Sequence, residues 1–544
     1  MTTVQTILQN FNEEKSLRLK QFLCFAVLVM IYYIFLYLNG FFQIGWLSDS
    51  YEDMYFAVNT SVFNIFKGNV HFGRYRPLLF LILKILYHTN SVLGFDSDNF
   101  IFFNITRSLL YLFSGVIIYK LLRLFSVERL ISTLASLIVL FYPNNIHNLA
   151  WSAAFFEILS LIVYLLSIYF TVMLLKTENS FFIPLVLLLF VLGILLKETN
   201  LTIPLTGILF VFLLGHNLKG KEMKILFGIE FFLISIYAAL KFFVLNHSLN
   251  DALSLNFSNI YKLLIKIYIS YLVPGDYIEI LLNVFNYNLL TLGYLVMLVL
   301  ILTLIFLKQK ANKNFLIIFI MSLILVSPNI YAGYLRPQLI LIPFSILFTG
   351  IVFTVSRKFK HYYTVIIMTL FLCLFMWLSA INIRDWKETY VVMKNKMEVM
   401  LENKHGFSGN DVLVGNTSRI KQCFLFDNPT FIFNYWKYKQ VSFVDTVNSY
   451  LSTVSSGEFD NNIPIKCYAS NDSLILSVNH ENGYFADDEH NKQNSDEYEI
   501  QFFGKIKILE RNRFQKTTKV QVLLYNKNLN LYYMDESKLK SIIL

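Results

Sequence analysis

Cysteine is scarce in this 544-residue chain, which contains four. No two of them form a Cys-X-X-Cys motif, and no group of Cys and His has the spacing of a zinc site, so the common zinc modules are excluded. Cys24 and Cys373 lie in apolar segments, where cysteine usually packs as a small hydrophobe. Cys423 and Cys467 lie in the C-terminal region, where a disulfide between them is one arrangement left open.

Charge is sparse as well: 15% of residues are charged, 56% are hydrophobic, and the mean hydropathy is +0.54. This composition excludes an ordinary soluble protein, and the repeated long apolar runs predict membrane spans. Residues 383–544 hold 20 basic and 20 acidic residues, so the whole formal excess of +10 lies in residues 1–382. There the bases gather at the ends of apolar runs, which indicates membrane topology and no nucleic-acid partner.

A cleavable signal peptide is not expected at the start of this sequence. Residues 1–20 are polar, and the apolar run that follows is too long for a signal core and has no small-residue cleavage site. We expect this run to be an uncleaved first span.

The apolar runs predict a polytopic α-helical membrane protein with about eleven transmembrane helices. The expected spans are 21–42, 102–123, 130–148, 153–175, 180–196, 200–215, 223–245, 288–307, 314–328, 337–355 and 362–382. With residue 1 inside, lysines and arginines concentrate in the inner connections, and the short outer connections carry only Lys197 and Arg336. This pattern places the first loop, 43–100, and the C-terminal region on the outer side.

Two outer stretches, 77–100 and 246–287, read as helices that lie along the membrane interface, with tilted spans as the alternative. After residue 382 the hydropathy falls, and short alternating apolar runs predict strands. We therefore expect a multi-spanning domain over 1–382, and a small β-rich or mixed α/β extracytoplasmic domain over 383–544.

Three acids follow the first expected span. If this segment is helical, Asp49 shares one face with Glu52 and with Asp53, which lie three and four residues after it. A carboxylate here can accept the proton of an acceptor hydroxyl. The acids can instead bind a divalent cation, for which Asp49 and Asp53 are the ligands to consider. A solvated acidic loop is the alternative without a catalytic role.

Three arginines are expected on the same side of the membrane. Arg74 and Arg76 lie in the motif Gly-Arg-Tyr-Arg-Pro-Leu, and Arg336 lies between the ninth and tenth spans. Arginine suits bidentate binding of phosphate, so these side chains are candidates for holding an anionic leaving group. Contact with lipid headgroups is the alternative.

A lysine–glutamate pair and a histidine complete the candidate set. Lys197 and Glu198 lie at the outer end of a hairpin, where Lys197 can contact a phosphate and Glu198 can orient it. A structural ion pair that seals the hairpin is the alternative. His147 ends the third expected span and is a supporting candidate, although a lone histidine more often packs or donates a hydrogen bond.

The order of these motifs resembles the GT-C superfamily of polyprenyl-phosphate-sugar-dependent glycosyltransferases. It is most similar to the protein O-mannosyltransferases and the bacterial lipid A aminoarabinose transferases, over about residues 20–355. The motifs in order are Asp49, Arg76-Pro77-Leu78, Asn104, Pro143 with His147 and Ala150-Trp151, Lys197-Glu198-Thr199 with Pro204, and Tyr334-Leu335-Arg336.

The resemblance implies that a sugar is transferred, with inversion, from a polyprenyl-phosphate carrier to a hydroxyl of a protein or glycolipid outside the cytoplasm. It makes Asp49 the general base. The family often has a second acid next to the first, and this chain has Ser50 there, so Glu52 or Asp53 stays open as the base.

The same resemblance places Arg76, Lys197 and Arg336 around the donor phosphate, with Arg74 close by. Pro337 follows Arg336 where the family usually has tyrosine, so this chain departs from the family pattern there. Beyond a divalent cation that the acids would suit, no cofactor is expected. The expected partners are the lipid-linked sugar, the acceptor and membrane lipids.

Two other classes of protein fit a polytopic chain. A transporter or lipid flippase would use charges among its spans, although the sequence shows no internal repeat and no paired broken helices. A non-enzymatic assembly protein would use its outer domain as a binding module. The bacterial inner membrane is the expected location, and the endoplasmic reticulum is the alternative.

Overall fold

The computed structural model describes the helical part of the chain with gaps, and the strands after it. The described residues are 26, 29–45, 49–67, 75–94, 101–216, 220–243, 312–332, 337–357, 360–402 and the strands between 411 and 542. The expected span 288–307 and the expected interfacial stretch 246–287 lie outside them.

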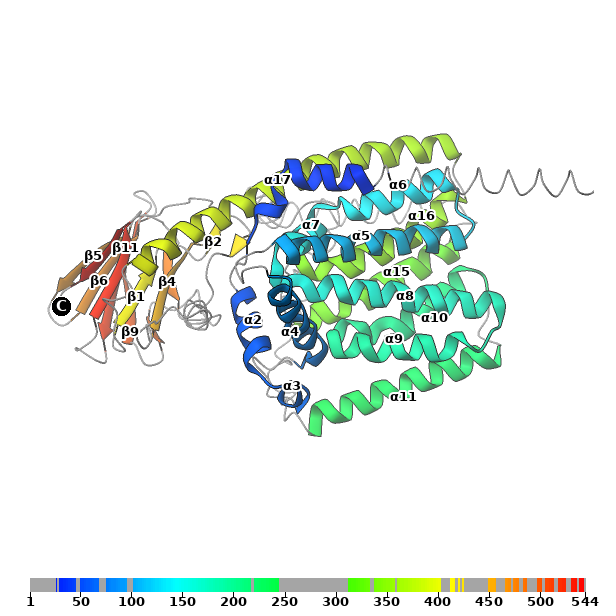
Figure 1. The fold of residues 1–544 in the computed structure, drawn as a ribbon, viewed down its shortest axis with the longest axis horizontal. Helices are drawn as coiled ribbons and strands as arrows, with labels where there is room; N and C mark the ends of the chain where they lie inside the picture. The colour runs from blue at the N-terminus through cyan, green and yellow to red at the C-terminus, as the bar shows by residue number, and fades with distance from the viewer. Residues whose placement is uncertain are drawn as a thin grey trace, which may run out of the picture.

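Helices make up most of this part of the chain (Figure 1). After a first apolar helix, Val29–Leu38, they are η1 (Phe41–Gln43), α2 (Asp49–Asn59), α3 (Val62–Lys67), α4 (Pro77–Val92), α5 (Ile101–Leu124), α6 (Arg129–Leu140), α7 (Pro143–Ala150), η3 (Ser152–Ala154), α8 (Phe155–Thr177), α9 (Phe182–Leu196), η4 (Glu198–Thr202), α10 (Ile203–Leu213), α11 (Lys221–Phe243), α15 (Asn312–Ala332), η6 (Pro337–Ile340), α16 (Leu341–Ser356) and α17 (His361–Glu402).

Four of these helices are long and apolar enough to cross a membrane: Ile101–Leu124, Phe155–Thr177, Lys221–Leu240 and His361–Val391. A fifth span forms if α6 and α7 are counted as one bent pair. Each matches a span expected from the sequence, so the described part of the chain agrees with a helical membrane protein. The other expected spans that are described are shorter apolar helices of 10–17 residues.

The expected span 130–148 is not a single straight helix. It divides into α6 and α7, which meet at an angle of 54°. Pro143 is the first residue of α7, and Tyr142 before it is extended, with φ −69° and ψ 126°. Proline has no N–H to continue the helix ladder and disfavours helical geometry in the residue before it, so the chain turns here.

The bundle has α8 at its centre, in contact with α5, α9, α10 and α16. Apolar residues of α8 such as Leu161, Leu165 and Ile168 are fully buried in the main core. At one end of the bundle lie α2, α3 and α4, the helices of segment 43–100, which the sequence predicts to be the first outer loop (Figure 1).

Helix α4 covers the apolar run that the sequence predicts as a helix after Pro77, and it packs against α2 and α9. The ammonium group of Lys84 in α4 donates hydrogen bonds to the carbonyls of Ala57, Val58 and Thr60, at 3.3, 2.9 and 3.0 Å. These carbonyls end α2, where a cation also stabilises the negative end of the helix dipole. Lys84 therefore joins the acid-bearing helix to the helix that begins after Arg76.

Helix α17 continues past residue 382 to Glu402 and contacts β3 and β12. The strands are β1 (Asp411–Gly415), β2 (Arg419–Ile420), β3 (Cys423–Phe424), β4 (Ser449–Ser455), β5 (Ile465–Ser470), β6 (Ser473–Val478), β7 (Gly483–Ala486), β8 (Glu497–Ile500), β9 (Gly504–Asn512), β10 (Thr517–Leu524), β11 (Asn530–Asp535) and β12 (Lys538–Ile542). The side chains of the strands, including those of Cys423 and Cys467, lie outside the described part of the structure.

The strands form three sheets. One has the order β12-β11-β1-β4-β7, in which β1 runs parallel to both β11 and β4. Another has the order β5-β6-β10-β9-β8 and is antiparallel throughout. The third is the short antiparallel pair of β2 and β3.

Candidate functional site

Arg76 is held at the start of α4. It is the N-cap residue of that helix, and Pro77 after it supplies the fixed φ that suits a first helical position. The guanidinium carbon lies 4.3 Å from the ring centre of Phe156, and the side chain is 13% exposed. Cation–π contact and partial burial therefore fix Arg76 against the start of α8.

Lys197 is buried by the turn that ends α9. Its backbone is extended (φ −164°), and its N–H donates to the carbonyl of Gly193 at 2.9 Å. The side-chain amide of Asn200 donates to the carbonyls of Gly193 and Lys197, at 3.0 and 3.1 Å, which closes the turn. The lysine side chain points into the bundle and donates a hydrogen bond to Glu157 of α8.

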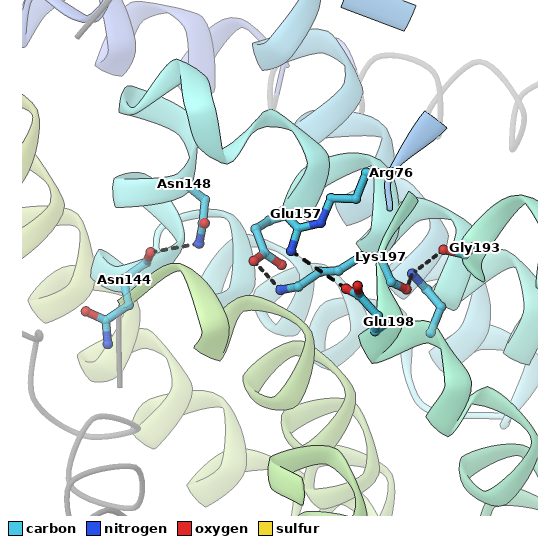
Figure 2. Close-up of polar contacts among 8 residues, drawn as sticks. Arg76, Asn144, Asn148, Glu157, Gly193, Lys197 and Glu198 are labelled. Atoms are coloured by element: carbon cyan, nitrogen blue, oxygen red, sulfur yellow. Dashed lines mark hydrogen bonds and ion pairs between the residues drawn. The ribbon is translucent and has the colours of Figure 1, made fainter. Parts of the chain in front are cut away.

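Glu157 and Glu198 provide two carboxylates for the two cations (Figure 2). Lys197 and Glu157 form an ion pair whose side chains are 5% and 1% exposed. Arg76 Nη2 and Glu198 Oε2 are 3.7 Å apart, with side chains 13% and 27% exposed. We call Arg76, Glu157, Lys197 and Glu198 the four-charge cluster. Phe156 lies beneath both cations, 5.3 Å from Lys197 Nζ.

Burial is the main influence on the pKa of Lys197. Removal from water lowers the pKa of its ammonium group, and the negative charge of Glu157 opposes that shift in part. Because a buried charge without a partner is costly, Glu157 is the group that makes a lysine tolerable at this position. Lys197 directs its side-chain hydrogen bond to Glu157, although Glu198 is its neighbour in sequence.

The three candidate acids, Asp49, Glu52 and Asp53, lie on α2. The predicted helix is present, so Glu52 and Asp53 lie three and four residues after Asp49 on helical backbone. Asp53 is half-buried and has interaction partners, whereas the side chains of Asp49 and Glu52 lie outside the described part of the structure. Helix α2 packs against α4, which follows Arg76, and against η3, which precedes α8.

The structure thus brings together Arg76, Lys197 and Glu198 from the residues predicted by sequence. Arg74 and Arg336 lie outside the described residues. His147 is 1% exposed on α7, and its ring contacts those of Trp151 and Trp386, at 5.7 and 4.9 Å between centres.

Glu157 is the residue of the cluster that sequence reasoning missed. It lies in the first turn of α8, inside the expected span 153–175, where an acid is costly unless it is paired. A single glutamate at the start of an apolar run was the available signal. Its partner could not be read from the sequence, because Lys197 is forty residues further along the chain.

A second buried cation, Arg107 of α5, also escaped prediction. It is 3% exposed, and it donates hydrogen bonds to Asn104 Oδ1 and to the carbonyl of Ala150, the latter at 3.5 Å. Asn104 in turn donates to the carbonyl of Ile44 at 2.9 Å. Arg107 therefore ties α5 to the C-terminal end of α7, where the helix dipole favours a positive charge.

Among the described residues, no group of three or more His, Cys, Asp or Glu side chains is placed to hold a metal ion. Comparison with models of known protein families and a search of curated proteins both find no match. The GT-C resemblance therefore stays a prediction from the motifs.

Proposed function

We propose that this protein is a GT-C-like glycosyltransferase of the membrane, which moves a sugar from a polyprenyl-phosphate carrier to an acceptor hydroxyl of a protein or glycolipid. The observation that carries the proposal is the meeting of Arg76 and Lys197, from separate segments, over the same aromatic ring. Helix α2, which carries the candidate acids, packs against α4, which begins after Arg76, and against η3, which precedes α8 and its Glu157.

The cations would act on the departing phosphate. Negative charge builds on the phosphate oxygen as the bond to the sugar breaks, and fixed positive groups in a site with little water stabilise it most. Arg76 can bind two phosphate oxygens through its fork of N–H groups, and Lys197 can act as a point charge. Arg336, with Arg74 close by, would complete this set of cations.

The acid would act on the acceptor. Asp49 takes the proton of the acceptor hydroxyl while the hydroxyl oxygen forms a bond to the anomeric carbon, and the bond from that carbon to the phosphate oxygen breaks. The bonding electrons leave with the polyprenyl phosphate. A single displacement of this kind inverts the anomeric configuration. Glu52 and Asp53 are the other candidates for the base, and a divalent cation at Asp49 and Asp53 is the alternative use of these acids.

The wider arrangement belongs to the same proposal. Residues 1–382 would form about eleven spans, with the first outer loop at 43–100 and the extracytoplasmic β-rich region at 383–544. The prenyl tail of the donor would lie among the spans. The bacterial inner membrane is the proposed location, with the endoplasmic reticulum as the alternative.

The test is sugar transfer by purified protein from a polyprenyl-phosphate sugar to a hydroxyl acceptor. We expect Asp49→Asn to lower the rate by about 10²- to 10⁴-fold, the usual contribution of a general base, without change in melting temperature. Asp53→Asn is the matched variant one helical turn away. If Asp49→Asn retained full transfer while Asp53→Asn abolished it, the assignment of the base would be wrong.

A transporter or lipid flippase is the second candidate, and Glu230 is the observation that favours it. Glu230 lies within α11, is 1% exposed, and its Oε2 has no hydrogen-bond partner among the described residues. Ionisable residues inside a membrane commonly mark an ion or substrate pathway. Close by, the Tyr164 hydroxyl lies 2.9 Å from Thr202 Oγ1 and 2.6 Å from Thr206 Oγ1.

Liposomes that contain a fluorescent polyprenyl phosphate separate the two candidates. Movement of the label between leaflets, lost in Glu230→Gln and accompanied by no sugar transfer, would favour transport. Sugar transfer by wild-type protein and by Glu230→Gln alike would favour the glycosyltransferase.

A further inference from the structure

The two ion pairs of the four-charge cluster differ in how far their side chains are exposed to solvent. Lys197 and Glu157 are both almost fully buried and are joined by a hydrogen bond. Arg76 and Glu198 are 3.7 Å apart, beyond hydrogen-bond distance, and Glu198 is 27% exposed. A buried pair is strongly coupled because neither charge can return to water, whereas a partly exposed pair contributes little. The Arg76–Glu198 contact is therefore the one that an incoming anion can replace.

Arg76 also has unused capacity to donate hydrogen bonds. Its Nε is buried and has no hydrogen-bond partner among the described residues. A guanidinium group carries five N–H donors in a planar fork, and its Nε–H and one terminal N–H can bind two oxygens of one phosphate together. Phe156 lies against the guanidinium group and helps to fix its orientation. The Glu198 carboxylate lies near the Arg76 guanidinium as a counter-ion, but at 3.7 Å it accepts no hydrogen bond from it.

The formal charges of the cluster cancel, since two cations are matched by two carboxylates. A phosphate that entered beside all four groups would meet no net positive charge. If Glu198 moves away from Arg76, the three remaining groups, Arg76, Lys197 and Glu157, together keep one positive charge. The cluster then favours an anion.

We propose that Glu198 is an internal competitor for the anion at Arg76, and that the phosphate of the lipid-linked donor displaces it while Glu157 stays on Lys197. Glu157 is then a positioning residue, which holds the lysine ammonium group in place within the bundle. This inference rests on the proposed function, because it takes the anion to be a polyprenyl phosphate. It assigns opposite roles to the two glutamates.

The experiment is an equilibrium titration of the purified, detergent-solubilised full chain with a C55 polyprenyl phosphate, the uncharged polyprenol and a phosphatidic acid. Glu198→Gln is expected to bind polyprenyl phosphate about two- to fivefold more tightly, the factor expected for removal of one partly exposed competing charge. Binding of polyprenol should not change. Glu198→Ala is a second variant that removes the same charge.

Glu128→Gln is the matched control. Glu128 lies between α5 and α6, its Oε2 is 2.5 Å from His361 Nδ1, and its side chain is 56% exposed. It should leave the affinity for polyprenyl phosphate unchanged. Melting temperature and a single peak in size-exclusion chromatography establish that each variant is folded.

The results separate the inference from the proposal on which it rests. If wild-type protein bound polyprenyl phosphate no better than polyprenol, or bound phosphatidic acid equally well, the proposed function would fail. If wild-type protein preferred polyprenyl phosphate but both Glu198 variants bound it with unchanged or lower affinity, the role of Glu198 as a competitor would be wrong while the proposed function stood.

Discussion

At the scale of single residues, the main feature is which carboxylate pairs with which cation. Lys197 and Glu198 are adjacent, yet each forms its ion pair with a residue from another segment. The chain is extended at Lys197 and begins a 3-10 turn at Glu198, so the two side chains leave the backbone in different directions. Glu157 is therefore the direct hydrogen-bond partner of Lys197, and the expectation that Glu198 orients Lys197 stays a prediction.

Removal of the Glu157 charge should destabilise the protein strongly. Glu157→Gln leaves the Lys197 ammonium buried without a counter-ion, a change that typically costs about 3–5 kcal/mol. Unfolding of the purified protein in detergent, followed by heat or denaturant, measures this loss. The double variant Glu157→Gln/Lys197→Met should recover most of the stability, because it leaves no buried charge unpaired.

Glu128→Gln serves as the control for this prediction as well. Glu128 and His361 are both about half exposed, so loss of their contact should lower the free energy of unfolding by less than about 1 kcal/mol. Equal stability of Glu157→Gln and wild-type protein would show that the Lys197–Glu157 pair is not the stabilising contact described here.

At the scale of elements, the position of the acids depends on how α2 is attached to α4. Helix α2 has 11 residues and would be marginal in isolation, because short helices rarely repay the cost of nucleation. Lys84 donates hydrogen bonds to three carbonyls at the C-terminal end of α2. The ring centres of Phe56 in α2 and Phe80 in α4 are 4.6 Å apart. These contacts hold the helix with Asp49 and Asp53 at one end of the bundle.

Lys84→Met should loosen α2 without unfolding the bundle. Loss of the hydrogen bonds from a charged donor is expected to raise the free energy of the docked helix by about 1.5–3 kcal/mol. Hydrogen–deuterium exchange should then be faster across residues 49–60, and unchanged in α8. Lys67→Met is the control, because Lys67 is exposed at the end of α3 and contacts the Phe63 ring at 5.7 Å. Equal exchange in both variants would contradict a capping role for Lys84.

At the scale of the whole molecule, the charge distribution predicts the sidedness of the protein. With the eleven expected spans, lysines and arginines of the short connections would concentrate on one side, and the acidic first loop and the C-terminal region would fall on the other. Both proposals need this arrangement, because the four-charge cluster and α2 have to meet the acceptor outside the cytoplasm.

Reporter fusions test the predicted sidedness. Alkaline phosphatase joined after Leu544 should be active in a bacterial host, and green fluorescent protein at the same site should be dark. Fusions after residue 218, in an inner connection rich in lysine, should show the reverse. Green fluorescence from the fusion after Leu544 would invert the topology and remove the extracytoplasmic site from the proposal.

The sequence alone determined the features that arise from local pattern. Long apolar runs become helices because a backbone in lipid has to satisfy its own hydrogen bonds, and α5, α8, α11 and α17 follow those runs. The helical spacing of Asp49, Glu52 and Asp53 on α2 and the helix that begins at Pro77 are local in the same sense.

Tertiary structure alone decided which charges meet. Glu157 and Arg107 lie inside expected spans. Glu157 is tolerated there because the distant Lys197 pairs with it, and Arg107 because Asn104 of its own helix and the distant carbonyl of Ala150 accept its hydrogen bonds. No local pattern specifies the two distant partners. Pro143 marks a break in the sequence, but the 54° between α6 and α7 depends on what packs around them. Chain folding in three dimensions is what sets Arg76 and Lys197 against one ring, each opposite its own carboxylate.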